Sequence, residues 1–263
     1  MPLGKNRKEN KMIDQKEKEK FAAVCESVIA AGHTDMGIGS LGEKYMHRIL
    51  KTFLCADTDC HEVGQGSFVA DVVVEDTIYE IQTGGYYPLK KKLEYYLSEG
   101  DKRIIIVTPV IRKSRLIWVD PETGATKPGR LTTRPMAWIG ILRELFYLCE
   151  QLDFHRVGFW FPVLAVDDYR KLDGYGKDRK IRATKIERIP RELLDMEEAS
   201  EVADVARLFV PESLPERFFA KDFSALTGAR RMGLSACLRA LEALDIITRD
   251  GKQGNAIVYR RLI

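Results

Sequence analysis

The sequence has no long apolar run and no strong excess of charge of either sign. No stretch approaches the roughly 18 uninterrupted apolar residues that a membrane-spanning helix needs. Residues 1–20 are charged throughout and contain no apolar segment of the signal-peptide kind. We therefore expect a cytoplasmic protein that does not use a membrane as its partner.

The sequence also lacks the cysteine pattern of a disulfide framework. Its five cysteines are odd in number and scattered along the chain. Cys55, Cys60 and His61 lie close together, but neither a CxxC pair nor a second pair of ligands accompanies them. We interpret them as ordinary reduced thiols rather than as a zinc site.

The net charge of +3 does not by itself indicate a nucleic-acid partner, but the basic residues are clustered. Residues 170–191 contain nine basic and three acidic side chains, and residues 192–204 contain six acidic and no basic ones. A protein that contacts phosphates needs such clusters. A solvated loop followed by an acidic helix explains the same pattern, and both interpretations stay open here.

The order of expected elements indicates a mixed α/β fold, with a central mixed sheet flanked by helices. Helices are expected at 21–31 and 40–54, and β-branched or alternating runs predict three strands at 60–63, 68–74 and 78–83. A helix at 89–97 follows, then buried strands at 103–111 and 116–120 and a helix at 136–152. Residues 156–189 are expected to form strands around a basic loop.

The segment 68–84, FVADVVVEDTIYEIQTG, contains the most informative pattern. If Glu75 and Asp76 form a two-residue hairpin turn, Asp71 lies directly opposite Glu80 on the same face. Gln82 shares that face, because it follows Glu80 by two residues. The Cβ atoms of Asp71 and Glu80 would then be roughly 5 Å apart. A slip of one residue would place the two carboxylates on opposite faces.

Two carboxylates in direct opposition repel each other unless a positive charge lies between them. A hard divalent cation, Mg²⁺ or Mn²⁺, is a suitable guest for Asp71 and Glu80 and could polarise a phosphodiester. The alternative is a pair of solvent-facing acids on an ordinary hairpin. The apolar neighbours on both sides of each acid make a central hairpin the better interpretation.

Asp71 and the Glu80-Ile81-Gln82 segment, in an order of helix, three strands, helix and strand, resemble the PD-(D/E)XK nuclease superfamily over about residues 40–120. The resemblance implies a restriction-endonuclease-like fold in which Asp71 and Glu80 bind the metal. It also implies that Gln82 takes the third motif position, which orients the attacking water. Glu43 occupies the place of a further acid that the preceding helix often supplies, although Ser40 and Glu43 also form a capping box.

Gln82 departs from the family pattern, because lysine is usual at the third position. Glutamine cannot carry a positive charge or act as a base. Some members of the superfamily cut with another residue there, and some are inactive binding proteins. A lysine of the following helix could substitute, with Lys90, Lys91 and Lys92 as the candidates.

Residues 214–263 predict a short helix that ends at Gly228, a longer helix and then a β-hairpin with Gly251 and Gly254 in its turn. This order resembles a winged helix-turn-helix domain, which implies a second helix in the major groove and a wing on the DNA backbone. Winged helices also bind proteins, so that alternative stays open. The expected DNA contacts of the whole chain are Lys177, Arg179, Lys180, Arg182, Arg230, Arg231, Ser235, Arg239, Arg249 and Lys252.

The sequence thus predicts a metal-dependent DNA endonuclease with Glu43, Asp71, Glu80 and Gln82 in its active site, and a homodimer is possible. A non-catalytic DNA-binding protein built on a decayed nuclease fold is the alternative. The expected regions are a tail and helix at 1–35, a nuclease-like domain at 36–152, a basic region with an acidic connecting helix at 153–209, and a winged helix at 210–263.

Overall fold

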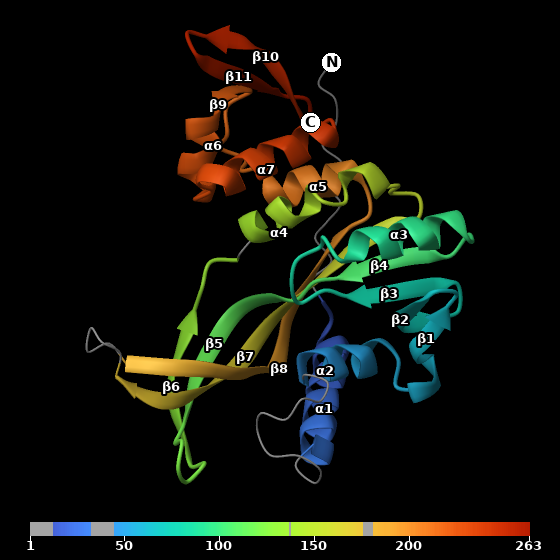
Figure 1. Cartoon of the computed structure of the whole chain (residues 1–263), viewed down its shortest axis with the longest axis vertical. Coiled ribbons are helices and arrows are strands. Elements are labelled where there is room, and N and C mark those ends of the chain that lie inside the picture. The colour runs from blue at the N-terminus through green and yellow to red at the C-terminus, as the bar shows by residue number, and fades with distance from the viewer. Residues whose placement is uncertain (1–12, 33–44, 137, 176–180) are drawn as a thin grey trace.

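The computed structural model describes residues 13–32, 45–136, 138–175 and 181–263. Its centre is an eight-stranded mixed sheet in the order β1-β2-β3-β4-β7-β5-β6, with β8 paired to β7 (Figure 1). The β3–β4, β4–β7 and β5–β7 pairs are parallel and the others antiparallel. The strands of this sheet are β1 (His61–Gln65), β2 (Phe68–Val74), β3 (Thr77–Ile81), β4 (Arg103–Val107), β5 (Val110–Val119), β6 (Thr126–Thr133), β7 (Val157–Tyr175) and β8 (Ile181–Ala199).

Helices cover both faces of this sheet, as Figure 1 shows, so the predicted mixed α/β fold with flanking helices is confirmed. One face packs against α1 (Gln15–Gly32) and α2 (Tyr45–Leu54), whose buried residues include Phe21 and Ile49. The other face packs against α3 (Leu89–Ser98), α4 (Trp138–Leu145) and α5 (Val202–Phe209). No helix of the described residues is long and apolar enough to cross a membrane.

The predicted order of helix, three strands, helix and strand is present as α2, β1–β3, α3 and β4. The expected strand at 103–111 is divided at Thr108 and Pro109, because proline has no N–H to donate to a ladder. The parallel register along β7 nevertheless continues, from Val107 opposite Trp160 to Val110 opposite Val163. Strand β5 therefore includes residues 112–115, which the sequence analysis placed between two separate strands. Strand β6 was not expected and lies at the edge of the sheet.

The segment 192–199 forms part of β8, so the expected acidic helix is wrong for these residues. Leu193 is fully buried and lies opposite Leu164 of β7. This long-range pairing outweighs the helical preference of the glutamates, and α5 begins only at Val202. The expected helix at 136–152 is likewise shorter, since α4 ends at Leu145 and a 3-10 turn, η2, follows at Cys149–Gln151.

The β7–β8 hairpin contains a buried charge cluster on its α1 side. Asp168 is 1% exposed and accepts hydrogen bonds from Arg170 at 3.0 Å and Arg188 at 3.5 Å. Burial by itself acts to raise the pKa of Asp168, but the two guanidinium groups outweigh it and hold that pKa below its usual range. The carboxylate therefore stays charged inside the sheet.

The C-terminal residues form a second, three-stranded sheet in the order β10-β11-β9. Gly228 ends α6 with a φ of 76°, as the sequence predicted. Helix α7 of this unit packs against α4, where the thiol of Cys237 donates to the carbonyl of Ile139 at 3.6 Å, and α4 in turn packs on the main sheet through the edge-on contact of Trp138 with Phe161 of β7. The elements are β9 (Arg217–Phe219), α6 (Ala220–Thr227), α7 (Arg231–Ala243), β10 (Ile247–Gln253) and β11 (Ala256–Arg261).

Candidate functional site

The hairpin of β2 and β3 has the register that the sequence predicted. Val74 lies opposite Thr77 and Val72 lies opposite Tyr79, with Glu75 and Asp76 in the turn between the strands. Asp71 and Glu80 occupy the next position along the two strands. Here a side-chain hydrogen bond joins the strands, because Asp71 Oδ2 accepts from the backbone N–H of Ile81 at 2.7 Å.

Glu80 is the most buried acid of this hairpin, with an exposed fraction of 3%. Lys92 of α3 places its Nζ 2.6 Å from Oε2 of Glu80, and the hydroxyl of Tyr96 donates to Oε1 at 3.0 Å. Both carboxylate oxygens therefore have a donor, which is what a buried charge requires. The side chain faces α3, on the same side of the sheet as α4 and α5.

Burial raises the pKa of Glu80 from 4.5 to about 7, although the charge and hydrogen bond of Lys92 act to lower it. The charge of Asp71 raises the same pKa further, which places the two carboxylates within electrostatic reach of each other. Burial and the charge of Glu80 in turn raise the pKa of Tyr96, so its hydroxyl keeps the proton that it donates. The site therefore holds two neighbouring acids, and Lys92 partly compensates the charge of Glu80.

Gln82 lies directly after the end of β3 and is half-buried. Its backbone N–H donates to the carbonyl of Val107 at 2.8 Å, so the ladder with β4 continues past the last residue of the strand. The alternation of side chains therefore places Gln82 on the same face as Glu80. Glu80 and Gln82 thus share one face of the sheet, and Asp71 lies beside them through its hydrogen bond to the N–H of Ile81.

Lys92 is the functional candidate that sequence reasoning left unresolved among three consecutive lysines. Lys90 forms an exposed ion pair with Glu150 at 2.9 Å, and Lys91 is exposed to solvent. Only Lys92 lies on the buried side of α3, where its side chain is 19% exposed. Helix α3 therefore supplies a cation to Glu80.

Several predicted residues fall where the structure says nothing of their side chains. Glu43, with its proposed capping partner Ser40, lies outside the described residues. The same holds for Lys177, Arg179 and Lys180 of the basic loop. Arg182 lies in β8 opposite Gly174, but its side chain is not described.

The predicted DNA contacts of the C-terminal unit are all exposed, but two already have partners within the chain. The guanidinium of Arg239 lies 4.5 Å from the ring centroid of Phe146, and Arg249 forms an ion pair with Glu242 at 2.7 Å. The other four, Arg230, Arg231, Ser235 and Lys252, are exposed.

The opposite side of α7 packs against α4 and η2. The thiol of Cys237 donates to the carbonyl of Ile139 at 3.6 Å, and the thiol of Cys149 donates to the carbonyl of Ala240 at 3.8 Å. These contacts leave Arg231 and Ser235 on the free side of the helix.

Asp71 and Glu80 fit a hard cation that prefers oxygen ligands. Mg²⁺ keeps several of its waters and takes one or two carboxylates from a protein, so two acids suffice. In the described part of the chain, no group of three or more His, Cys, Asp or Glu side chains could share a metal ion. An ion at this hairpin would therefore depend on these two acids together with water or substrate oxygens.

A family model described as "Domain of unknown function (DUF8091)" matches residues 44–200. This match spans more than half of the chain, and the chain belongs to this family. The matched region runs from the start of α2 to the end of β8, so it contains Asp71, Glu80, Gln82 and Lys92. No curated protein and no solved structure matches the chain.

Proposed function

We propose that this member of the DUF8091 family is a metal-dependent DNA endonuclease of the PD-(D/E)XK type. The observation that carries the proposal is the Asp71–Glu80 pair on the β2–β3 hairpin, with Lys92 at 2.6 Å from the second acid. A buried carboxylate with a strongly raised pKa, beside a second acid and a lysine, is typical of functional sites. A hairpin with a purely structural role does not require a buried carboxylate in such surroundings.

The arrangement of elements supports the same proposal. Helix α2, strands β1 to β3, helix α3 and strand β4 follow one another in the order of the restriction-endonuclease-like core. The acids lie on its second and third strands, which are the strands that carry the motif in that superfamily. This order of elements supports the assignment of the motif to Asp71, Glu80 and Gln82.

The chain's own residues have separable roles in this proposal. Asp71 and Glu80 would hold Mg²⁺ or Mn²⁺, which would supply Lewis-acid polarisation of the phosphodiester. The N–H of Ile81 and the hydroxyl of Tyr96 fix the orientation of the two carboxylates. Lys92 provides the positive charge and the proton donor that are usual at the third motif position, where Gln82 can only offer an uncharged amide.

The C-terminal elements support DNA as the substrate. The order α6, α7 and a β10–β11 hairpin resembles a winged helix-turn-helix, whose second helix, here α7, enters the major groove and whose wing touches the backbone. Arg230, Arg231 and Ser235 belong to the exposed start of α7, and Lys252 lies in the wing. Arg239 would have to leave the ring of Phe146 before it could contact a base.

A non-catalytic DNA-binding protein is the second candidate, and two observations favour it. Gln82 replaces the usual lysine, and Lys92 already compensates the charge of Glu80 without a metal. In that case the hairpin acids would be a remnant of a decayed site. Binding of Mn²⁺ separates the two candidates, because a decayed site has no reason to bind the ion.

Cleavage of supercoiled and linear DNA by the purified full chain tests the proposal. The reaction is run with Mg²⁺, with Mn²⁺ and with a chelator, for the wild type and for Asp71→Asn and Glu80→Gln. Asp76→Asn is the matched control, because Asp76 is an exposed acid in the turn of the same hairpin. We expect metal-dependent cutting by the wild type and the control only. Equal DNA binding without cutting by all four proteins would favour the second candidate.

A further inference from the structure

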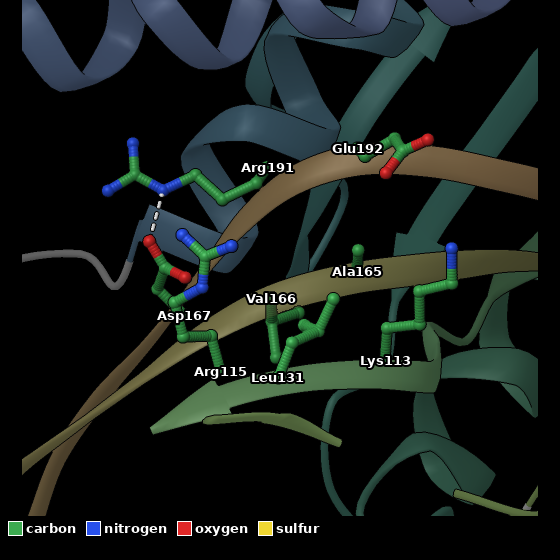
Figure 2. A pocket seen from close by; sticks show the side chains of 8 residues that line it. All are labelled: Lys113, Arg115, Leu131, Ala165, Val166, Asp167, Arg191 and Glu192. Atoms are coloured by element: carbon green, nitrogen blue, oxygen red, sulfur yellow. Dashed lines mark hydrogen bonds and ion pairs between the residues drawn. The ribbon is translucent and has the colours of Figure 1, made fainter. Parts of the chain in front are cut away.

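The central sheet has a second polar surface, beyond the region that α4 and α5 cover. Phe159, Phe161 and Val163 of β7 face these helices, and Ala165 and Asp167 continue the same face of the strand. Here the sheet forms a hollow of about 360 Å³ (Figure 2). The hollow is lined by Lys113, Arg115, Leu131, Ala165, Val166, Asp167, Arg191 and Glu192.

The pairing of four strands brings these side chains together. Lys113 of β5 lies opposite Ala165 of β7, which lies opposite Glu192 of β8. Arg115 lies opposite Asp167 on one side and opposite Leu131 of β6 on the other. The side chain of Ala165 is too small to fill the hollow. Figure 2 shows the basic side chains projecting from the strands around Ala165.

Arg191 reaches the hollow because it is the extra residue of a β-bulge in β8. The neighbouring pairs are Ala165 with Glu192 and Val166 with Pro190, which leaves Arg191 without a partner in the ladder. A bulge redirects the side chain of its extra residue. The guanidinium of Arg191 thereby donates to Asp167 at 2.8 Å and to the hydroxyl of Tyr169 at 3.2 Å.

The lining of the hollow has a net positive charge, since Lys113, Arg115 and Arg191 outnumber the two acids Asp167 and Glu192. Asp167 is paired with Arg191, whereas Lys113 and Arg115 form no ion pair within the described part of the chain. The two residues are two positions apart on β5, so their Cα atoms are separated by roughly 6.6 Å. Nothing in the packing of the sheet requires two adjacent cations on this face.

The surrounding hairpin makes a polyanion a better ligand than a single small anion. Residues 112–134, which cover most of β5 and all of β6, contain six basic side chains and two acidic ones. The two acids, Asp120 and Glu122, both lie at the tip of the hairpin, away from the hollow. A basic surface that extends over several strands is the electrostatic footprint of nucleic-acid binding.

We propose that Lys113, Arg115 and Arg191 form a binding surface for the phosphate backbone of duplex DNA, separate from the acids that would cut it. The proposal deepens the proposed function and rests on it. Glu80 faces α3 on the same side of the sheet as this hollow, and α4 and α5 lie between the two regions. Contacts of this kind position the duplex without reading its sequence.

Salt-dependent DNA binding tests the proposal, measured by fluorescence anisotropy with a labelled duplex of mixed sequence. A chelator is present, so that no cutting occurs. The test variant is Lys113→Ala/Arg115→Ala. The matched control is Lys16→Ala/Lys18→Ala, which removes the same charge from α1 on the other side of the sheet. Thermal unfolding of each protein verifies that the variants are folded.

We expect the test variant to bind more weakly and with a smaller salt dependence. Each lost phosphate contact lowers the slope of log K against log salt by about 0.9, so two lost contacts lower it by about 1.8. Between 50 and 200 mM salt, the wild type should then lose about tenfold more affinity than the variant. Glu192→Gln is expected to change affinity in the opposite sense, because it removes a negative charge from the rim.

The outcomes separate this proposal from the nuclease proposal. If the test variant and the α1 control bind with the same affinity and slope as a wild type that cuts DNA, the backbone surface is refuted and the nuclease stands. If the slope falls as expected but the wild type never cuts, the surface stands and the nuclease is refuted. A wild type that does not bind duplex DNA at all refutes the surface.

Discussion

The buried carboxyl of Glu80 makes the stability of the fold depend on pH in a direction that can be measured. Burial raises the pKa of Glu80 from 4.5 to about 7, against the lowering effect of Lys92. A carboxyl with a higher pKa in the folded than in the unfolded chain takes up a proton on folding. Its stabilising contribution is therefore complete below pH 4.5 and lost as the pH rises through about 7.

The size of this effect follows from the shift of the pKa. A rise from 4.5 to about 7 corresponds to about 3 kcal/mol, at 1.36 kcal/mol for each pKa unit. The wild type thus loses about this much unfolding free energy from Glu80 between about pH 4 and about pH 8. Glu80→Gln removes the titration and keeps an acceptor for the hydroxyl of Tyr96. Over this interval, the stability of the variant relative to wild type should rise by about 3 kcal/mol.

Urea unfolding at a series of pH values measures this difference. Glu99→Gln is the matched control, because Glu99 is an exposed glutamate at the end of α3 and makes the same chemical change without burial. The control is expected to follow the wild type at every pH. Parallel pH profiles for the wild type and Glu80→Gln would refute the buried, proton-binding carboxyl and with it the electrostatic account of the site.

Three further predictions concern other residues. Lys92→Met should slow cleavage by about 100-fold or more, whereas the exposed Lys91→Met should leave it unchanged, and equal rates would remove Lys92 from the mechanism. Asp168→Asn should cost about 1–3 kcal/mol at neutral pH. Because the pKa of Asp168 is lowered, this difference should disappear as the pH falls through that pKa, and a constant difference in urea unfolding would contradict the account. Gly66→Ala should lower the melting temperature by a loss of about 1 kcal/mol or more, since its φ is 57° and an added Cβ would meet Tyr95; an unchanged melting temperature would count against this.

The centre of the candidate site could be predicted from sequence because its determinants are local. Glu75 and Asp76 interrupt two β-branched runs, and a two-residue turn fixes the register of everything that follows. Asp71 and Glu80 are only nine positions apart, so the turn alone brings them together. Because side chains alternate along a strand, Gln82 is then expected on the same face as Glu80.

Lys92 could not be chosen in advance, because three consecutive lysines point in three directions from one helix. Only the packing of α3 on the sheet decides which of them faces Glu80. The expected helix at 192–199 was wrong for a similar reason, because these residues form part of strand β8. Its glutamates favour a helix locally, and its partner in β7 lies about 30 residues earlier in the chain.

The basic hollow could not be predicted from the sequence either, because it depends on pairing between distant strands. Its three cations lie in β5 and β8, and they meet only through β7, which comes between these strands in the sequence. A bulge then redirects Arg191 toward Asp167, and no pattern in the sequence marks that bulge. The charge counts of residues 112–134 and 170–191 were the available signals, and they indicate basic segments without placing them in space.

The most direct test of the central claim is the rate of nicking of supercoiled DNA in Mg²⁺ by the wild type, compared in one assay with Asp71→Asn and Asp76→Asn. The account predicts that Asp71→Asn is slower by about 100-fold or more, in line with the loss of a catalytic group. It predicts that Asp76→Asn cuts at the wild-type rate. Cutting by Asp71→Asn at the rate of the wild type, or no cutting by any of the three proteins, would contradict the assignment of a nuclease site to the β2–β3 hairpin.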